Sequence, residues 1–298
     1  MTNLKKIQNW INNKHIDFFI LNRSDEFLNE YIASYAERLK WLSNFSGSAG
    51  RAIISINKAI IFVDGRYTDQ VKEQVDNKIF IIKHINKYWD WLEKNIYKKK
   101  IISIDPKLHS VIEINKLNKI IKSNNSKLKL LYDNPIDLFW NNQPKYPFSN
   151  SFIHEKKYSG KTIGQKIETV CSILKKQSVD YYLLNSLDSI AWLLNIRGKD
   201  LPYTPFIFCY AIICKNKKVN LFIDLKKIDL IKKHLENHVN FFSINKIHNF
   251  FDEFDKNFNI GMDIHRTNFY FKDLCELNNI KIKYENDPCY YLKSIKNS

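Results

Sequence analysis

The sequence lacks several features that would assign it to a familiar class. Its five cysteines are odd in number and have no C-x-x-C spacing, which favours reduced, buried thiols. The opening residues MTNLKKIQNW contain no apolar signal-peptide core. The longest apolar run, Phe206 to Cys214, is far shorter than the roughly 20 residues of a membrane-spanning helix. We therefore expect reduced thiols, a cytoplasmic location and no membrane partner.

Arginine is also scarce, although the formal net charge is +16. Only 6 of the 47 basic residues are Arg, and 41 are Lys. A basic chain can bind nucleic acid, but nucleic-acid readers favour arginine because its planar guanidinium pairs bidentately with phosphate and guanine. The lysines are scattered, and the chain is rich in Asn and Ile, as an AT-rich genome would encode. We expect no nucleic-acid partner.

What the chain does contain is an internal repeat. Trp41 to Gly47 and Trp192 to Gly198 share the pattern W-L-x-N-apolar-x-G. A helix and a strand are predicted before each heptapeptide, and an apolar hairpin that ends at an aspartate is predicted after it. This matched order indicates two copies of one α/β domain. A length of 298 residues also suggests about two domains at ~150 residues each.

The expected fold class is therefore α/β, with two tandem homologous domains. Residues 1–140 are predicted to form domain I and residues 162–298 domain II. The linker between them, 141–161, contains two prolines that stiffen it. Within these domains, 226–238 is predicted to be a helix, and the polar segment 22–31 is predicted to be a loop.

Each tryptophan motif ends in a glycine that is predicted to form a turn. Glycine enters the left-handed region without steric cost, so Gly47 and Gly198 are predicted to end their helices with positive φ. The Asp64-Gly65 pair is predicted to turn the chain out of the first hairpin. The residues assigned to this structural motif are Trp41, Gly47, Gly50, Asp64, Trp192, Asn195 and Gly198.

These segments resemble the N-terminal two domains of aminopeptidase P (Xaa-Pro aminopeptidase), a three-domain branch of the creatinase and pita-bread group. Arg38 to Gly50 is similar to the family pattern R-x-x-W-L-S-G-F-x-G-S-A-G, with Asn44 where glycine is usual. Asp64 to Gln70 is similar to D-G-R-Y-x-x-Q, and Asp188 to Pro205 is similar to the second-domain signature. Lys293 to Asn297 resembles the segment before the catalytic domain. The resemblance implies two creatinase-N-like domains, each a mixed β-sheet flanked by helices.

The resemblance also implies where the chemistry resides. The family's third, C-terminal domain binds two divalent metals, usually manganese, through two Asp, one His and two Glu. These metals activate a water that attacks the peptide bond before proline. No such ligand can be assigned here, so we expect no catalytic residue, no metal and no cofactor in this chain, and no activity of the chain alone. The implied partners are the missing catalytic domain, the peptide substrate of the full enzyme and a possible second copy of the chain.

Two arginines stand out because arginine is rare. Arg66 and Arg197 either form a salt bridge or a carbonyl clamp inside their motifs, or they contact a domain or subunit boundary that faces the peptide channel. Together with Tyr67 and Tyr203 they are the candidates for a substrate gate or an interface. The implied function is a non-catalytic part of an Xaa-Pro aminopeptidase that contributes gating and assembly. The alternative is a free-standing, non-enzymatic protein-binding module derived from that fold, since a charge of +16 would suit an acidic partner.

Overall fold

The computed structural model describes residues 1–97 and 99–295. The chain divides into two compact units. The first comprises residues 1–26 and 32–146, and the second comprises residues 27–31 and those from 147 onward. The division between Tyr146 and Pro147 lies inside the segment predicted to be the linker.

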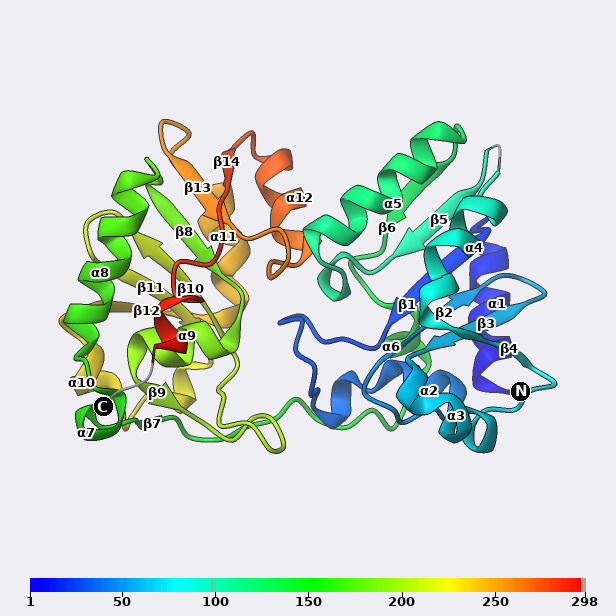
Figure 1. Cartoon of the computed structure of the whole chain (residues 1–298), viewed down its shortest axis with the longest axis horizontal. Coiled ribbons are helices and arrows are strands. Elements are labelled where there is room, and N and C mark those ends of the chain that lie inside the picture. Colours follow the sequence, from blue (N-terminus) through cyan, green and yellow to red (C-terminus); the bar gives the residue numbers. More distant parts are fainter. Residues whose placement is uncertain (98, 296–298) are drawn as a thin grey trace. The chain divides into compact units, whose positions relative to one another are not determined.

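The first unit contains a six-stranded mixed sheet in the order β4-β3-β2-β1-β5-β6 (Figure 1). β2 runs antiparallel to both β1 and β3, whereas the other neighbours are parallel. The strands are β1 (Phe18–Asn22), β2 (Gly50–Ile54), β3 (Ala59–Val63), β4 (Phe80–His84), β5 (Ile101–Ile104) and β6 (Lys127–Leu130).

The second unit repeats this arrangement, with the order β12-β11-β10-β8-β13-β14. β10 runs antiparallel to β8 and β11, and the remaining neighbours are parallel. The prediction of two tandem α/β domains with mixed sheets is confirmed. The strands are β8 (Tyr181–Leu184), β10 (Cys209–Cys214), β11 (Val219–Ile223), β12 (Val239–Ser243), β13 (Asn259–Met262) and β14 (Lys281–Tyr284), with a separate ribbon of β7 (Phe152–Ile153) and β9 (Ile196–Arg197).

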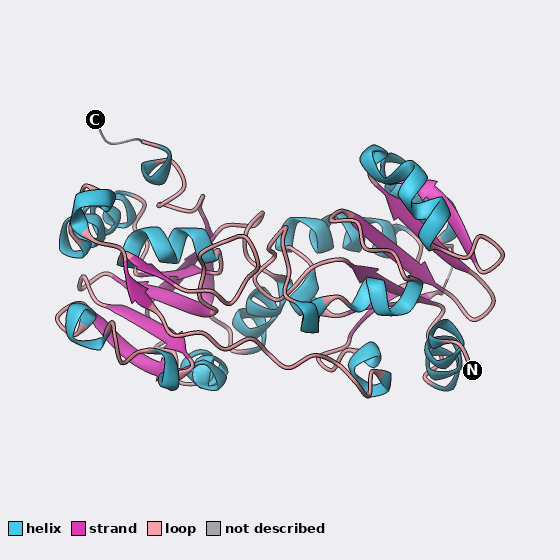
Figure 2. Cartoon of the chain, turned by 90° about the horizontal axis from the view of Figure 1, so that it is seen from below, coloured by secondary structure: helices cyan, strands magenta, loops and turns pink. Residues whose placement is uncertain are grey.

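Helices flank the strands of each sheet (Figure 2). In the first unit these are α1 (Asn3–Asn13), α2 (Arg38–Ser43), α3 (Thr68–Gln74), α4 (Tyr88–Asn95), α5 (Val111–Ser123) and α6 (Pro135–Phe139). In the second they are α7 (Lys156–Ser159), α8 (Ile163–Lys176), α9 (Leu187–Leu194), α10 (Lys232–Leu235), α11 (Ile247–Asp252) and α12 (Phe269–Leu277). Within the described residues, no helix combines the length and apolarity needed to cross a membrane.

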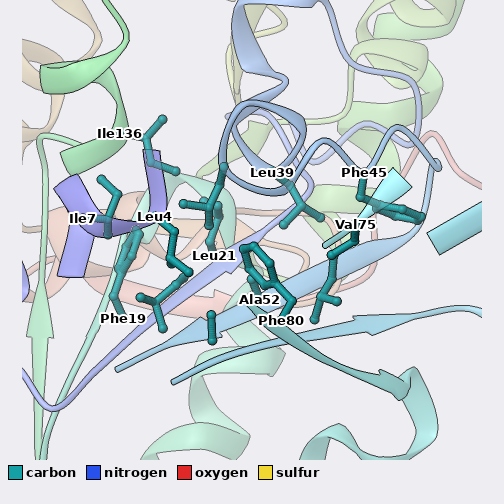
Figure 3. Packing of buried hydrophobic residues seen from close by; sticks show 14 of the residues in the cluster. Leu4, Ile7, Phe19, Leu21, Leu39, Phe45, Ala52, Val75, Phe80 and Ile136 are labelled. Carbon is teal, nitrogen blue, oxygen red and sulfur yellow. The ribbon is translucent and has the colours of Figure 1, made fainter. Parts of the chain in front are cut away.

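The hydrophobic core of the first unit consists of apolar side chains from its sheet and from the helices packed against it. In the first unit, Leu4 and Ile7 of α1 and Leu39 of α2 pack against Phe19 and Ala52 of the sheet (Figure 3). All five β3 residues are buried, as expected of a strand covered on both faces. At ~25 cal/mol per Å² of apolar surface removed from water, this burial is the main stabilising contribution to the domain.

The predicted helix over 226–238 is wrong. A short 3-10 turn spans Leu225–Lys227, and α10 covers only Lys232–Leu235. Lys227 is buried and ion-paired with Asp200 at 2.7 Å, whereas Leu230 is exposed. The segment is therefore a turn followed by one short helix, and not a continuous helix.

The prediction of positive φ at Gly47 and Gly198 is also wrong. The left-handed residues are Asn44 (φ 66°) and Asn195 (φ 52°), which cap the ends of α2 and α9. Among the described glycines only Gly160 has a positive φ. Asparagine tolerates this region better than other residues that carry a Cβ atom, so it replaces glycine as the cap.

One short segment belongs to the second unit although the residues before and after it in the sequence belong to the first. Residues 27–31, which follow β1 and were predicted to be a loop, belong to the second unit. Phe27 is only 2% exposed, and its ring lies 4.7 Å from that of Phe208 and 4.8 Å from that of Tyr210, centroid to centroid. We call residues 27–31 the strap. They add the Phe27 side chain to the core of the second unit, whose other residues begin at Pro147, 116 positions after Tyr31.

Candidate functional site

The first candidate site is the turn that follows β3. The Asp64 carboxylate accepts hydrogen bonds from Arg66 N at 3.0 Å and from Arg66 Nε at 2.9 Å. The backbone hydrogen bond, and then the side-chain bond, hold the pKa of Asp64 below its usual value. The Arg66 side chain is 61% exposed. Asp64 therefore orients a guanidinium that remains accessible to solvent.

Tyr67 packs this turn against the glycine turn between α2 and β2. Its hydroxyl lies 2.6 Å from Ser48 Oγ, and its ring meets that of Phe45 edge-on at 5.7 Å. The hydrogen bond with Ser48 lowers the pKa of Tyr67. A Cβ at Gly47 would lie 2.9 Å from Tyr67 Cδ1, and one at Gly50 would lie 2.8 Å from Phe45 Cε1. These glycines are required for close approach and not for their φ angles.

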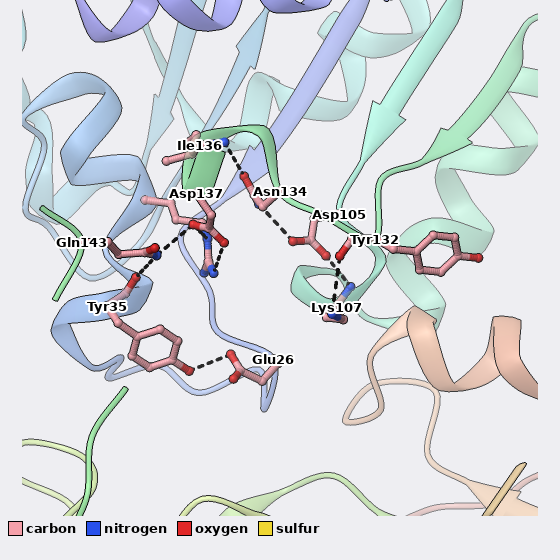
Figure 4. A network of polar contacts seen from close by, with 10 residues as sticks. Glu26, Tyr35, Asp105, Lys107, Tyr132, Asn134, Ile136, Asp137 and Gln143 are labelled. Carbon is pink, nitrogen blue, oxygen red and sulfur yellow. Dashed lines mark hydrogen bonds and ion pairs between the residues drawn. The ribbon is translucent and has the colours of Figure 1, made fainter. Parts of the chain in front are cut away.

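Arg38, three residues before the tryptophan motif, anchors the end of the first unit. Its Nε and Nη2 each donate to the Asp137 carboxylate at 2.8 Å. Gln143 also donates to Asp137, at 2.9 Å, and to the Tyr35 carbonyl at 2.9 Å (Figure 4). Trp41 lies beside this cluster, with its ring 6.2 Å from that of Trp140. The motif thus fixes α6 and the start of the segment that leads to the second unit.

In the second unit the equivalent motif surrounds a buried lysine that sequence reasoning did not single out. Lys166 Nζ donates to the Trp192 carbonyl at 2.8 Å and to Asn195 Oδ1 at 2.6 Å, and it lies 4.5 Å from the Trp192 ring centroid. Burial lowers the pKa of Lys166 to about 8. The available signal was its spacing from Ile163 and Val170, which places it on the inner face of α8.

Arg197 forms a carbonyl clamp. Its Nη1 donates to the carbonyls of Ala191 at 2.7 Å and Ile196 at 2.8 Å, and burial lowers the pKa of Arg197. A Cβ at Gly198 would lie 2.8 Å from Ile207 Cβ. This site therefore differs from the Asp64 turn, because its arginine is directed at the backbone.

Tyr203 lies at the tip of a loop whose stem is held firmly. Its side chain is 95% exposed, with φ 64°, and a bridge pairs Leu201 with Thr204. Below the loop, Asp200 accepts from Lys227 Nζ at 2.7 Å and from Phe208 N at 2.8 Å. The pair is buried, so Tyr203 is presented to solvent by a rigid base.

The described residues do not supply a donor set for a metal. Residues 1–97 and 99–295 contain no group of three or more His, Cys, Asp or Glu side chains that could hold a metal ion. All five cysteines are buried thiols, and burial raises the pKa of Cys275 to about 12 and that of Cys214 to about 11. These thiols are not poised for metal binding or nucleophilic chemistry.

Comparisons with known proteins agree with the repeat. Two models of the creatinase/prolidase N-terminal domain match, one over residues 3–131 and the other over residues 142–298. A probable Xaa-Pro aminopeptidase P of Paracoccidioides brasiliensis is 32% identical over 79% of this chain. One of Aspergillus fumigatus is 35% identical over 76% of it. The chain covers only 39% and 35% of these relatives.

A solved structure supports the same fold. The crystal structure of X-prolyl aminopeptidase from Caenorhabditis elegans, described as a cytosolic enzyme with a di-nuclear active site, superposes with a TM-score of 0.92. The match covers 99% of this chain and 51% of that one, at 23% sequence identity. With both halves matched by the family's models, the chain belongs to the creatinase/prolidase N-terminal domain family and carries two such domains in tandem.

Proposed function

We propose that this chain is the non-catalytic N-terminal part of an Xaa-Pro aminopeptidase, the class of enzyme that releases an N-terminal residue preceding proline. The observation that carries the proposal is the pair of relatives named Xaa-Pro aminopeptidase P, which align with over three quarters of this chain. The chain aligns with less than two fifths of each relative.

The role proposed for these domains is to gate the substrate and to assist assembly with the catalytic domain. Arg66 carries the gating proposal, because its guanidinium is exposed and is oriented by Asp64. The Tyr67 ring makes a cation–π contact with this guanidinium, whose carbon lies 5.3 Å from the ring centroid. Tyr203 offers an exposed aromatic surface. Arg197 serves as a positioning residue, since it clamps backbone carbonyls.

Two further parts of the proposal concern cofactor and location. The two divalent metals, which we take to be manganese, would bind in the catalytic domain. The C. elegans relative is described as having a di-nuclear active site. A cytoplasmic location agrees with five buried, unpaired thiols. A homodimer remains part of the proposal, as does the peptide substrate of the complete enzyme.

The test is reconstitution. The purified chain with Mn²⁺ should hydrolyse no Xaa-Pro peptide, whereas adding the C-terminal catalytic part of a fungal relative in trans should give association and turnover. Metal-dependent hydrolysis by the chain alone would overturn the non-catalytic assignment. Failure to associate with any catalytic part, together with capture of an acidic protein, would favour the alternative of a free-standing binding module.

A further inference from the structure

The second unit contains a cavity of about 490 Å³ that the tryptophan motifs do not use. One wall follows the end of β8 and includes Ser186 and Asp188. A second wall follows the end of β13 and includes His265 and Arg266. The strap closes a third side with Phe27 to Glu30. A volume of this size falls within the range of small-molecule sites.

The cavity lies where ligands bind in other α/β folds. β8 and β13 are parallel neighbours in the sheet (Figure 1). From β8 the chain continues through α9 to β10 on one side, and from β13 it continues through α12 to β14 on the other side. The strand order therefore reverses between β8 and β13. A crevice outside the carboxyl ends of two such strands is the usual ligand position in open α/β sheets.

The corresponding edge of the first unit is occupied by its own side chains. Asn22, at the end of β1, donates to the Leu108 carbonyl at 3.3 Å and to both oxygens of Glu113 at 3.1 and 3.2 Å. Arg51 pairs with Glu113 at 2.7 Å. In both units an aspartate follows the strand, and a helix begins six residues later, so Leu108 and Arg266 take equivalent places. The edge of the sheet that is filled by hydrogen-bonded side chains in the first unit therefore corresponds to a cavity lined by charged residues in the second.

Among the charged side chains around the cavity, Arg266 has guanidinium N–H groups that are available to a ligand. Asp188 is already paired with Lys293, which also donates to Ser189 Oγ at 3.0 Å. Arg266 Nη1 lies 3.9 Å from Asp188 Oδ1, and the guanidinium stacks on Tyr290 at 4.1 Å. In the part of the chain that the structure describes, this guanidinium donates no hydrogen bond. Its planar fork is suited to a bidentate carboxylate.

We propose that this cavity binds a small zwitterion, namely a free amino acid or a short peptide. The ligand carboxylate would pair with Arg266, with the Ser186 hydroxyl and the His265 imidazole as further polar groups in the lining. The ligand ammonium would face the carboxylates of Asp188 and Glu30, which disfavour a ligand that carries negative charge alone. The inference goes beyond the proposed function, since the cavity lies within one unit and requires no catalytic domain.

The test uses the complete chain and isothermal titration calorimetry. The probes are L-alanine, L-proline and the dipeptide Ala-Pro, compared with N-acetyl-L-alanine, which lacks the ammonium, and L-alaninamide, which lacks the carboxylate. At least one zwitterion should bind, and each half-charged analogue should bind about tenfold more weakly or worse, because one charged contact is lost. Equal binding of N-acetyl-L-alanine would overturn the zwitterion assignment, and no binding by any zwitterion would overturn the site.

Variants locate the binding. Arg266→Gln should weaken zwitterion binding about tenfold or more, and Arg266→Lys should retain part of it. The matched control is Lys215→Gln, which removes a positive charge elsewhere in this unit, on a partly exposed lysine paired with Asp180 at 3.0 Å, and should leave affinity unchanged. The Nε–Hε NMR signal of Arg266 should shift with ligand, which identifies the contact directly in the folded chain. Unchanged affinity in Arg266→Gln, or an unperturbed Arg266 signal at saturation, would place the ligand elsewhere and refute the proposal.

Discussion

Asn44 and Asn195 occupy the same left-handed position at the ends of α2 and α9, 151 residues apart. Each caps its helix by donating its N–H to the carbonyl four residues earlier, that of Lys40 and that of Ala191. Their side chains differ. Asn44 is exposed, whereas Asn195 is buried and binds Lys166 Nζ and the Lys161 carbonyl.

Asparagine-to-glycine substitutions should separate these two roles. Asn44→Gly should change the free energy of unfolding by no more than about 0.5 kcal/mol, because glycine accepts the left-handed backbone. Asn195→Gly should cost about 1–3 kcal/mol, because Lys166 loses its side-chain acceptor inside the protein. Urea denaturation midpoints measure both changes. Equal midpoints for the two variants would contradict the burial argument.

Glycine-to-alanine substitutions test close packing. Gly47→Ala and Gly198→Ala should each destabilise by about 1–3 kcal/mol, since the added methyl would overlap Phe45 and Ile207 respectively. Gly65→Ala is the matched control, because its Cβ would meet only the end of the His84 side chain at 3.2 Å. Thermal unfolding provides the measurement. If all three variants melt alike, contact with neighbours does not explain the two motif glycines.

Local patterns predicted most of the regular fold. The hairpin strands carry runs of β-branched residues, and α8 has both a helical apolar face and the capping box of Thr162 and Gln165, so short-range physics determines them. The region 226–238 could not be predicted in this way. Its apolar spacing suggests a helix, but the buried Asp200–Lys227 pair is a tertiary interaction that local periodicity does not encode.

The candidate sites were predictable only in part. The motif positions of Arg66 and Arg197 are visible in the sequence, but the exposure of one guanidinium and the backbone contacts of the other depend on folding. Phe27 gave no signal, because a single aromatic residue in a polar loop has no periodicity. The cavity at Arg266 requires the strap as a wall, so it too lay beyond sequence reasoning.

Phe27 should stabilise the second unit although it precedes the first tryptophan motif. Phe27→Ala should cost about 3–5 kcal/mol, the usual range for emptying a buried aromatic site, because the ring packs on Phe208 and Tyr210. Hydrogen exchange followed by mass spectrometry should show the loss of protection in β10. Loss confined to residues 32–146 would contradict the assignment of the strap to the second unit. Leu138→Ala, at an exposed apolar position, is the control.

Acid should destabilise the first unit through Glu113. Burial raises the pKa of Glu113, but Arg51 and then His109 outweigh it and bring that pKa to about 2, from an ordinary value of 4.5. A depressed folded-state pKa gives stability that is present above pH 4.5 and is lost as pH falls toward 2. The loss should amount to a few kcal/mol. Glu113→Gln should flatten the pH dependence in that window. An equally steep acid transition in the variant would show that other groups cause it.

Arg66 and Arg197 should respond differently to alanine substitution. Arg66→Ala should change stability by less than about 0.5 kcal/mol, since its ion pair with Asp64 is exposed to solvent. Arg197→Ala should cost about 1–3 kcal/mol, because the carbonyls of Ala191 and Ile196 lose their donor. Denaturant titration of each purified variant measures both changes.

In the reconstituted enzyme, Arg66→Ala should have a larger effect on association and turnover than Arg197→Ala. Arg66→Ala and Tyr203→Ala should reduce association with the catalytic part or peptidase turnover, because both side chains are exposed and are proposed to meet the partner or the peptide. Arg197→Ala should affect either readout only as far as it unfolds the chain. Lys72→Ala, which breaks another exposed ion pair of the first unit, controls for loss of surface charge. If Arg66→Ala and Tyr203→Ala both leave association and turnover unchanged, the gate-and-interface proposal is wrong and the motifs serve packing alone.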